Sequence, residues 1–162
     1  MSGFLDWRGH AWIALAARLY LAAVFLLACG HKILHPEAFA VDVATYRILP
    51  LALVNPTAIL LPWLELAVGL LLAIGFRARA AALLAGGLMV VFLVALVSAL
   101  ARGLDMSCGC FASEGAGADP ISGWTVLRDV GWLGLAGYVV GFDGRPIGVD
   151  RLWIRSDGEV RR

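Results

Sequence analysis

The stretch AAALLAGGLMVVFLVALVSALA, residues 80–101, contains no charged side chain and decides the fold class. A helix needs about 20 mainly apolar residues to cross a hydrocarbon core of roughly 30 Å. A helix also satisfies its own backbone hydrogen bonds, which lipid cannot do for it. This stretch therefore predicts a transmembrane helix.

The composition of the whole chain agrees with a membrane protein. Of its 162 residues, 61% are hydrophobic and 15% are charged, and the mean hydropathy is +0.86. Soluble domains have about 45–50% apolar and about 25% charged residues. The net charge of +1 gives no strong basic field to attract nucleic acid. We therefore expect membrane lipid, and no nucleic acid, around this chain.

Three further apolar stretches have the length of a membrane span, and each carries few charges. They are residues 11–30 with Arg18, residues 56–76 with Glu65, and residues 124–142 with Arg128 and Asp129 near the start. Together with residues 80–101 they predict an all-α, integral membrane four-helix bundle. We place this domain at residues 1–145, followed by a cytoplasmic tail at residues 146–162.

The positive charges of the connecting segments predict the orientation, because Lys and Arg gather on the cytoplasmic side. Four spans put both termini on one side. That side carries Arg8, Arg77, Arg79, Arg145, Arg151, Arg155, Arg161 and Arg162, whereas the other carries Lys32, Arg47, Arg102 and Arg128. We expect a multi-pass protein of the plasma membrane, which is the inner membrane where there are two. Both termini are then cytoplasmic, and residues 31–55 and 102–123 face outward.

The outward segments contain one expected helix and one expected loop. Residues 37–49 place Ala38, Val41, Thr45 and Ile48 at helical spacing. This spacing predicts a short amphipathic helix on the outer face of the membrane. Residues 112–123, ASEGAGADPISG, are small and turn-rich, which predicts a flexible loop.

DMSCGCF, residues 105–111, contains the chemistry of the outer face. A disulfide between Cys108 and Cys110 is strained, because its preferred geometry is hard to reach over one intervening residue. Strained and exposed disulfides are the labile or catalytic kind, whereas a structural disulfide usually closes a longer loop. Disulfides persist outside the cytosol. The Cys-Gly-Cys spacing therefore favours a redox pair over a staple.

The third cysteine, Cys29, is expected at the outer end of the first span. As a third thiol it would relay thiol-disulfide exchange through a mixed disulfide. The alternative is a small apolar residue that packs near a helix end. Residues 26–29, LLAC, also resemble a lipoprotein cleavage box, but Arg18 interrupts the apolar region that such a signal requires.

A soft-metal site is the alternative reading of the outer face. Its candidate ligands for copper, zinc or mercury are Cys29, His31, His35, Cys108 and Cys110;. The two histidines have a spacing found in zinc sites, but Cys-x-Cys does not match the paired cysteine spacing. Our first expectation is therefore that the chain binds no metal, and the soft-metal site is the alternative.

The charges within the spans are expected to have partners, because a lone ion in the bilayer costs at least about 2.5–3.5 kcal/mol. Measured from the predicted outer ends of their spans, Arg18 lies about 18 Å deep and Glu65 about 13.5 Å deep. We predict that they pair, either as a structural lock or as a buried site for a quinone head group or a proton. Arg128 is expected either to snorkel to the interface or to stabilise a thiolate by lowering a cysteine pKa.

The sequence resembles the DoxX and MauE families of membrane proteins. The resemblance rests on Arg18, on Gly30-His31-Lys32-Ile33-Leu34, on Phe39 and Pro50, and on Glu65-Leu66-x-x-Gly69. Cys108-Gly109-Cys110-Phe111 with the later Trp124 and Arg128-Asp129 is similar to the MauE branch, and the resemblance covers roughly residues 11–142.

The MauE resemblance implies a four-helix membrane component of a thiol redox system in methylamine utilisation, with an extracytoplasmic thioredoxin-like partner. In this reading Cys108 and Cys110 form the redox pair of a thiol-disulfide oxidoreductase, which Cys29 and Arg128 assist. The candidate cofactor is a quinone. The alternatives are the soft-metal protein and a non-catalytic scaffold with a structural Cys-Gly-Cys loop.

Overall fold

A computed structural model describes residues 9–104, 106, 108–109 and 121–143. The described chain is α-helical, which confirms the predicted fold class. Its helices are α1 (His10–Leu34), α2 (Pro36–Thr45), α3 (Leu51–Ile74), α4 (Ala78–Ala101) and α5 (Gly123–Phe142).

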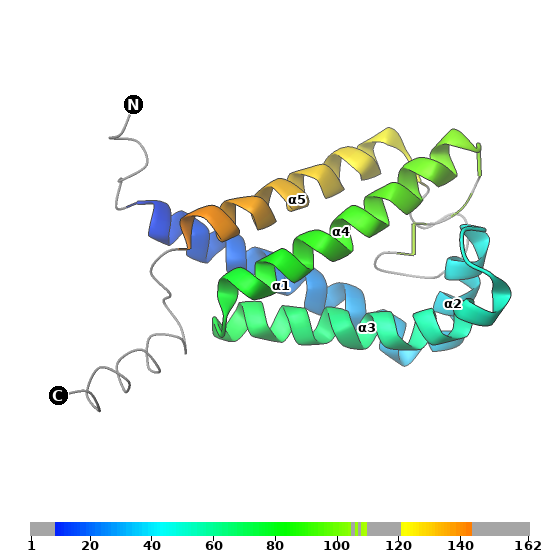
Figure 1. Cartoon of the computed structure of the whole chain (residues 1–162), viewed down its shortest axis with the longest axis horizontal. Helices are drawn as coiled ribbons and strands as arrows, with labels where there is room; N and C mark the ends of the chain where they lie inside the picture. Colours follow the sequence, from blue (N-terminus) through cyan, green and yellow to red (C-terminus); the bar gives the residue numbers. More distant parts are fainter. Residues whose placement is uncertain (1–8, 105, 107, 110–120, 144–162) are drawn as a thin grey trace.

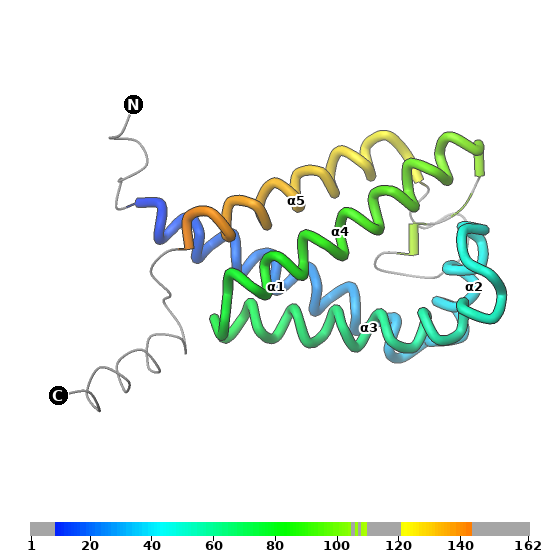
Figure 2. The backbone as a smooth tube through the Cα atoms, in the orientation of Figure 1, coloured from blue at the N-terminus to red at the C-terminus, as the bar shows by residue number. Residues whose placement is uncertain are grey.

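The four long helices form an antiparallel bundle, and the short α2 lies across one end of it (Figure 1). α1 packs against α3 and α5, α4 packs against α5 and α3, and α2 packs against α3. Figure 2 shows the chain running from one end of the bundle to the other in each successive long helix. We call the end where α4 finishes and α5 begins the Cys108 end, and the end where α3 finishes and α4 begins the Arg18 end.

Three of the helices, α1, α3 and α4, are long and apolar enough to cross a membrane. Many of their large apolar side chains are exposed on the bundle surface, for example Leu60, Val91 and Leu83. In a membrane protein this surface faces lipid. The fourth predicted span coincides with α5, and its crossing of the membrane stays a prediction.

Small side chains let the long helices approach each other closely. The main core of buried residues consists of Ala17, Leu21, Ala22, Phe25, Val68, Leu72, Ala81, Ala82, Ala85, Met89, Ala136 and Val139. Half of these are alanines. Membrane helices associate through such small-residue contacts, because lipid tails are as apolar as leucine and provide no hydrophobic driving force.

Three helix boundaries differ from the predicted ones by four or five residues. α1 continues to Leu34, whereas the predicted span ends at residue 30. α3 begins at Leu51 rather than at residue 56, so that Pro56 and Pro62 lie inside it. Membrane helices tolerate proline because neighbouring groups satisfy the freed backbone. α2 ends at Thr45 rather than at residue 49, because Arg47 has a positive φ of 51° that a helix cannot continue through;.

The turn between α3 and α4 shows why a glycine closes α3. Gly75 has a φ of 69°, and its N–H donates to the carbonyl of Leu71 at 3.0 Å, an arrangement typical of helix ends;. A Cβ atom at this position would also lie 2.9 Å from Nη2 of Arg18. The turn therefore lets the guanidinium of Arg18 pass directly against the end of α3.

Candidate functional site

A second, smaller core holds the segment that follows α4. Tyr46, Ala99 and Met106 are buried together, and Phe92, Ala95, Leu104 and Ile121 pack around them. The N–H of Ile121 donates to the carbonyl of Met106 at 3.1 Å. These contacts fix the chain on both sides of Cys108 between α2 and the start of α5.

Cys108 is buried and disulfide-bonded. Its exposed fraction is 2%, and it takes part in a disulfide, whereas Cys29 is a free cysteine. Cys110, the remaining cysteine of the sequence, lies outside the described residues. The finding agrees with the predicted redox pair in one respect only: Cys108 is in the oxidised state.

Gly109 has a conformation and a neighbour that other residues tolerate poorly. Its φ is 66°, and a Cβ atom would lie 3.0 Å from Oδ2 of Asp42 and 3.1 Å from its Cβ. Only glycine adopts a positive φ at little cost. The middle residue of Cys-Gly-Cys therefore allows both the turn of the chain and the close approach of α2.

Tyr46, just after α2, fixes the backbone of Cys108. Its hydroxyl donates a hydrogen bond of 2.9 Å to the carbonyl of Cys108, and Arg102 Nη2 donates to the carbonyl of Tyr46. Burial, followed by the negative charges of Asp42 and Asp129, raises the pKa of Tyr46 well above its usual value. The hydroxyl therefore keeps its proton and stays a donor to Cys108.

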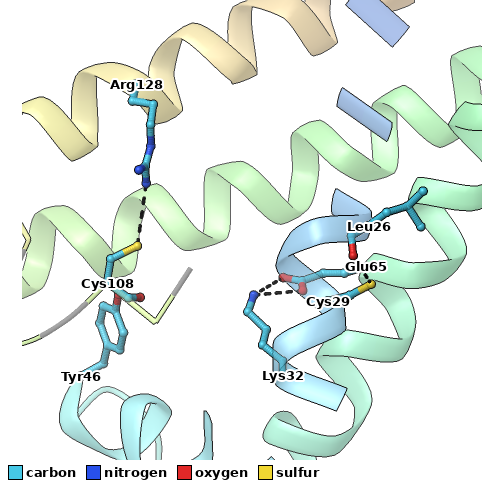
Figure 3. A network of polar contacts seen from close by, with 7 residues as sticks. All are labelled: Leu26, Cys29, Lys32, Tyr46, Glu65, Cys108 and Arg128. Atoms are coloured by element: carbon cyan, nitrogen blue, oxygen red, sulfur yellow. Dashed lines mark hydrogen bonds and ion pairs between the residues drawn. The ribbon is translucent and has the colours of Figure 1, made fainter. Parts of the chain in front are cut away.

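Arg128 at the start of α5 points its guanidinium at the sulfur of Cys108, as Figure 3 shows. Nη2 lies 3.9 Å from Sγ of Cys108, and Nε lies 3.3 Å from Oδ1 of Asp129. The guanidinium also lies over the ring of Trp132, 4.7 Å from its centroid. The carboxylate and the indole hold the cation in place beside the sulfur.

The structure places Cys29 away from Cys108 and Arg128. Cys29 is buried in α1, and its Sγ donates to the carbonyl of Leu26 at 3.2 Å. Figure 3 shows it beside Glu65 on the α1–α3 side, while the sulfur of Cys108 faces α5. No direct contact joins the sulfurs of these two described residues, so a relay through Cys29 stays a prediction.

The predicted pairing of Arg18 with Glu65 is wrong. Nη1 of Arg18 lies 3.3 Å from Oδ2 of Asp143 at the end of α5, whereas Glu65 accepts from Nζ of Lys32 at 2.7 and 2.9 Å. The depth estimate treated the outer ends of two helices as level. In the bundle the guanidinium of Arg18 lies against Gly75, about 15 Å further along α3 than Glu65. The two residues do not form one quinone or proton site.

The Lys32–Glu65 pair closes the α1–α3 interface at the Cys108 end. Both side chains are largely buried, with exposed fractions of 8% and 12%. Nζ of Lys32 also lies 4.9 Å from the centroid of the Phe39 ring in α2. Since cations are attracted to aromatic faces, Lys32 fastens α2 as well as α3.

The proposed metal ligands do not assemble within the part of the chain that the structure describes. No group of three or more His, Cys, Asp or Glu residues there is placed to hold a metal ion. The rings of His31 and His35 lie close, with centroids 4.9 Å apart. Cys110, the fifth candidate ligand, lies outside the described residues.

Sequence reasoning missed four partners: Asp143, Lys32, Tyr46 and Asp42. Lys32 follows Cys29 by three residues, about one helical turn, so the two share a face of the first span. The structure places Cys29, and with it Lys32, beside Glu65. Asp143 directly follows the last span, where a carboxylate is the natural partner for a buried arginine. Tyr46 and Asp42 carry no such signal, because they reach Cys108 only through tertiary packing.

The fold and the site define a class: a helical integral membrane protein with a disulfide-bonded loop at one end of its bundle. A family model described as methylamine utilisation protein MauE matches residues 10–142. The chain therefore belongs to the MauE family, as the Cys-Gly-Cys-Phe segment and its neighbours predicted.

Individual relatives agree with the family. The chain is 34% identical to the methylamine utilization protein MauE of Methylophilus methylotrophus over 145 residues, which is 89% of this chain and 74% of that protein. It is 35% identical to the protein of the same name from Paracoccus denitrificans over 122 residues, 75% of this chain and 64% of that protein. For the Methylorubrum extorquens protein, the identity is 36% over 95 residues, 58% of this chain and 51% of that protein. No solved structure matches the chain.

Proposed function

We propose that the chain is a membrane thiol-disulfide oxidoreductase that exchanges electrons with an extracytoplasmic thioredoxin-like protein. The observation that carries this proposal is the guanidinium of Arg128 beside the sulfur of the disulfide-bonded Cys108. A nearby cation stabilises a thiolate and lowers the pKa of its thiol. A structural disulfide has no need of such a cation.

The burial of Cys108 assigns roles to the two sulfurs. In exchange, a thiolate attacks one sulfur of the disulfide, forms a mixed disulfide and releases the other sulfur as a thiolate. Cys108, with an exposed fraction of 2%, is poorly placed for attack and well placed to leave beside Arg128. We assign the attacked position to Cys110, because Cys29 is free.

The electrons balance with a dithiol partner. The partner's first thiolate bonds to Cys110, and its second thiolate then displaces Cys110, so that the partner leaves as a disulfide. Two electrons pass to Cys108 and Cys110. A membrane quinone is the class of acceptor that we propose to reoxidise the pair.

The positive charges of the loops support an orientation for this chemistry, with the Cys108 end on the extracytoplasmic side of the plasma membrane. Disulfides persist in that compartment. The names of the relatives support methylamine utilisation as the pathway, in which the chain would act as an accessory membrane protein.

Trapping tests the proposal in native membranes. Wild type and the Cys108→Ser, Cys110→Ser and Cys29→Ser variants are exposed to a thioredoxin whose resolving cysteine is replaced by serine. Free thiols are then counted with a bulky maleimide on gels. The remaining thioredoxin cysteine is activated beforehand as a disulfide with thionitrobenzoate. We expect the free Cys110 thiolate of Cys108→Ser to attack this thioredoxin sulfur, release thionitrobenzoate and leave a trapped mixed disulfide. Cys29→Ser should behave as wild type.

Other outcomes point to the alternative functions. A disulfide that neither thioredoxin nor mild reductants open would indicate a scaffold with a structural loop. Thiols that stay free and become shielded only when zinc or cuprous ion is added would indicate a soft-metal protein. In that case His31→Ala and His35→Ala would matter, whereas thiol exchange does not require them.

A further inference from the structure

Asp42 in α2 places a carboxylate against the Cys-Gly-Cys turn. Its Oδ2 would lie 3.0 Å from a Cβ atom at Gly109, the residue that follows Cys108. The same oxygen is buried and has no hydrogen-bond partner. Buried acceptors normally have partners, and an unmade hydrogen bond of this kind is costly. The oxygen is therefore a feature to explain.

The disulfide-bonded state of the neighbouring Cys108 bears on this missing partner. A disulfide sulfur carries no hydrogen, so it can accept from Arg128 but cannot donate to Asp42. A thiol has both capacities, since its S–H is a weak donor and its sulfur a weak acceptor. Reduction therefore adds one donor to a site that already contains an unpartnered acceptor one residue away.

We propose that Asp42 is a positioning residue: once the Cys108 thiolate released by reduction has taken up a proton, Asp42 accepts a hydrogen bond from the resulting thiol. This inference rests on the proposed thiol-disulfide function and deepens it. The disulfide state leaves the carboxylate unsatisfied, and the reduced state satisfies it. Asp42 thus favours reduction, which makes the disulfide more oxidising and sets electron flow from the partner's dithiol into the pair.

The charged groups around Asp42 are consistent with this role. Tyr46 on the same segment directs its proton to the carbonyl of Cys108, so it is not the partner of the carboxylate. On α5, Arg128 contacts Asp129 and the sulfur of Cys108. Arg128 on α5 therefore contacts the sulfur of Cys108 as a donor, whereas Asp42 on α2 presents an acceptor to the next residue, Gly109.

The test is the equilibrium between the cysteine pair and glutathione buffers, measured on the full chain in detergent. We compare wild type with Asp42→Ala and with Glu37→Ala, an exposed carboxylate on the same helix. Loss of one hydrogen bond from the reduced state should lower the equilibrium constant for reduction by about fivefold. This corresponds to a reduction potential about 20 mV lower. Glu37→Ala should match wild type.

Two results separate the inference from the function on which it rests. A wild-type disulfide that never equilibrates with glutathione would contradict the thiol-disulfide function itself. Equilibration of wild type with an unchanged constant in Asp42→Ala would overturn the role of Asp42 alone. Asp42→Asn keeps an acceptor oxygen, so its constant should lie closer to wild type than that of Asp42→Ala.

Infrared spectroscopy of the reduced protein, with Asp42 unchanged, detects the proposed hydrogen bond directly. The S–H stretch of the reduced protein should lie at a lower frequency than that of a free thiol, because the S–H group is hydrogen-bonded to a carboxylate. The double variant Cys29→Ser, Cys110→Ser removes the other two thiols of the chain, so that the remaining S–H band belongs to Cys108. An S–H band of Cys108 at the free-thiol frequency would contradict the proposal.

Discussion

The two ends of the bundle use charge differently. At the Arg18 end, Arg18 is paired with Asp143, whose carbonyl also accepts from Nε of Arg79 at 3.1 Å. His10 stacks on Phe142 nearby, with ring centroids 4.5 Å apart. These contacts join the first and last long helices to the α3–α4 turn. Charge at this end holds helices together.

At the Cys108 end, the Lys32–Glu65 pair also joins helices, but further charged and polar groups lie around Cys108 and Gly109. Tyr46 holds the carbonyl of Cys108, Arg128 faces its sulfur, and Asp42 lies against Gly109 with an unpartnered oxygen. In the function that we propose, the same residue types serve stability at one end and a change of oxidation state at the other. Substitution of Arg18 should therefore alter stability, and substitution of Arg128 or Asp42 should alter redox behaviour.

The largest effect is expected for Arg18→Met. Removing one partner of a buried ion pair costs about 3–5 kcal/mol, because the other charge stays buried without compensation. We expect thermal unfolding in detergent to show a loss of this size. The glutathione equilibrium of the cysteine pair should not change.

A double variant is the control for this prediction. Arg18→Met combined with Asp143→Leu removes both charges, and apolar replacement of a whole buried pair is often neutral. Much of the lost stability should therefore return. A change in the redox equilibrium as large as the change in stability would break the distinction between the two ends.

Arg128→Gln should give the largest redox effect. Without the cation, the Cys108 thiolate is a poorer leaving group, and we expect thiol exchange with thioredoxin to slow about tenfold at neutral pH. Arg128→Lys keeps the charge and should retain part of the rate. Stopped-flow measurement of the exchange checks this.

The matched control for Arg128 is Arg102→Gln at the same end of the bundle. Arg102 donates to backbone carbonyls, namely those of Ser98, Tyr46 and Arg47, and not to the sulfur. Its exchange rate should stay near wild type. Equal slowing in both variants would mean that general positive charge, rather than the contact with Cys108, controls the rate.

Gly109→Ala compared with Gly103→Ala sharpens the role of α2. Both glycines have a positive φ, 66° and 62°, so alanine costs roughly 1–2 kcal/mol in backbone strain at either position;. A Cβ atom at Gly109 also meets Asp42, whereas one at Gly103 meets nothing within 4 Å. Gly109→Ala should therefore shift the glutathione equilibrium, and Gly103→Ala should not. Equal behaviour of the two variants would argue that Asp42 has no influence on the pair.

The sequence predicted what depends on composition and local pattern. Uninterrupted apolar length identified the long helices, and the Cys-Gly-Cys-Phe segment with Arg128-Asp129 indicated the family. Pro56 was a misleading boundary, because a membrane helix can contain proline. These features are local, so one sequence was enough to find them.

The partners of buried charges could not be predicted in the same way. Pairing depends on how far one helix slides along another, and a shift of one turn changes the depth by about 5.4 Å. Arg18 was therefore given the wrong carboxylate. Asp42 and Tyr46 were not recognised, since neither their spacing nor their type indicates that α2 folds over Cys108.

The smallest effect is expected for Tyr46→Phe, which removes the hydrogen bond to the carbonyl of Cys108. Such a bond contributes about 0.5–1.5 kcal/mol, and the ring can keep its edge contact with Phe92.

Burial raises the pKa of Tyr46 above that of the unfolded chain. The stabilisation is then complete below the ordinary tyrosine pKa of about 10 and is lost only as the pH rises through the raised value. Between about pH 6 and pH 9, below that ordinary value, the stability difference between wild type and Tyr46→Phe should therefore be constant. A difference that shrinks within this range would mean that Tyr46 ionises there, and that burial at the Cys108 end does not protect the proton which fixes the carbonyl of Cys108.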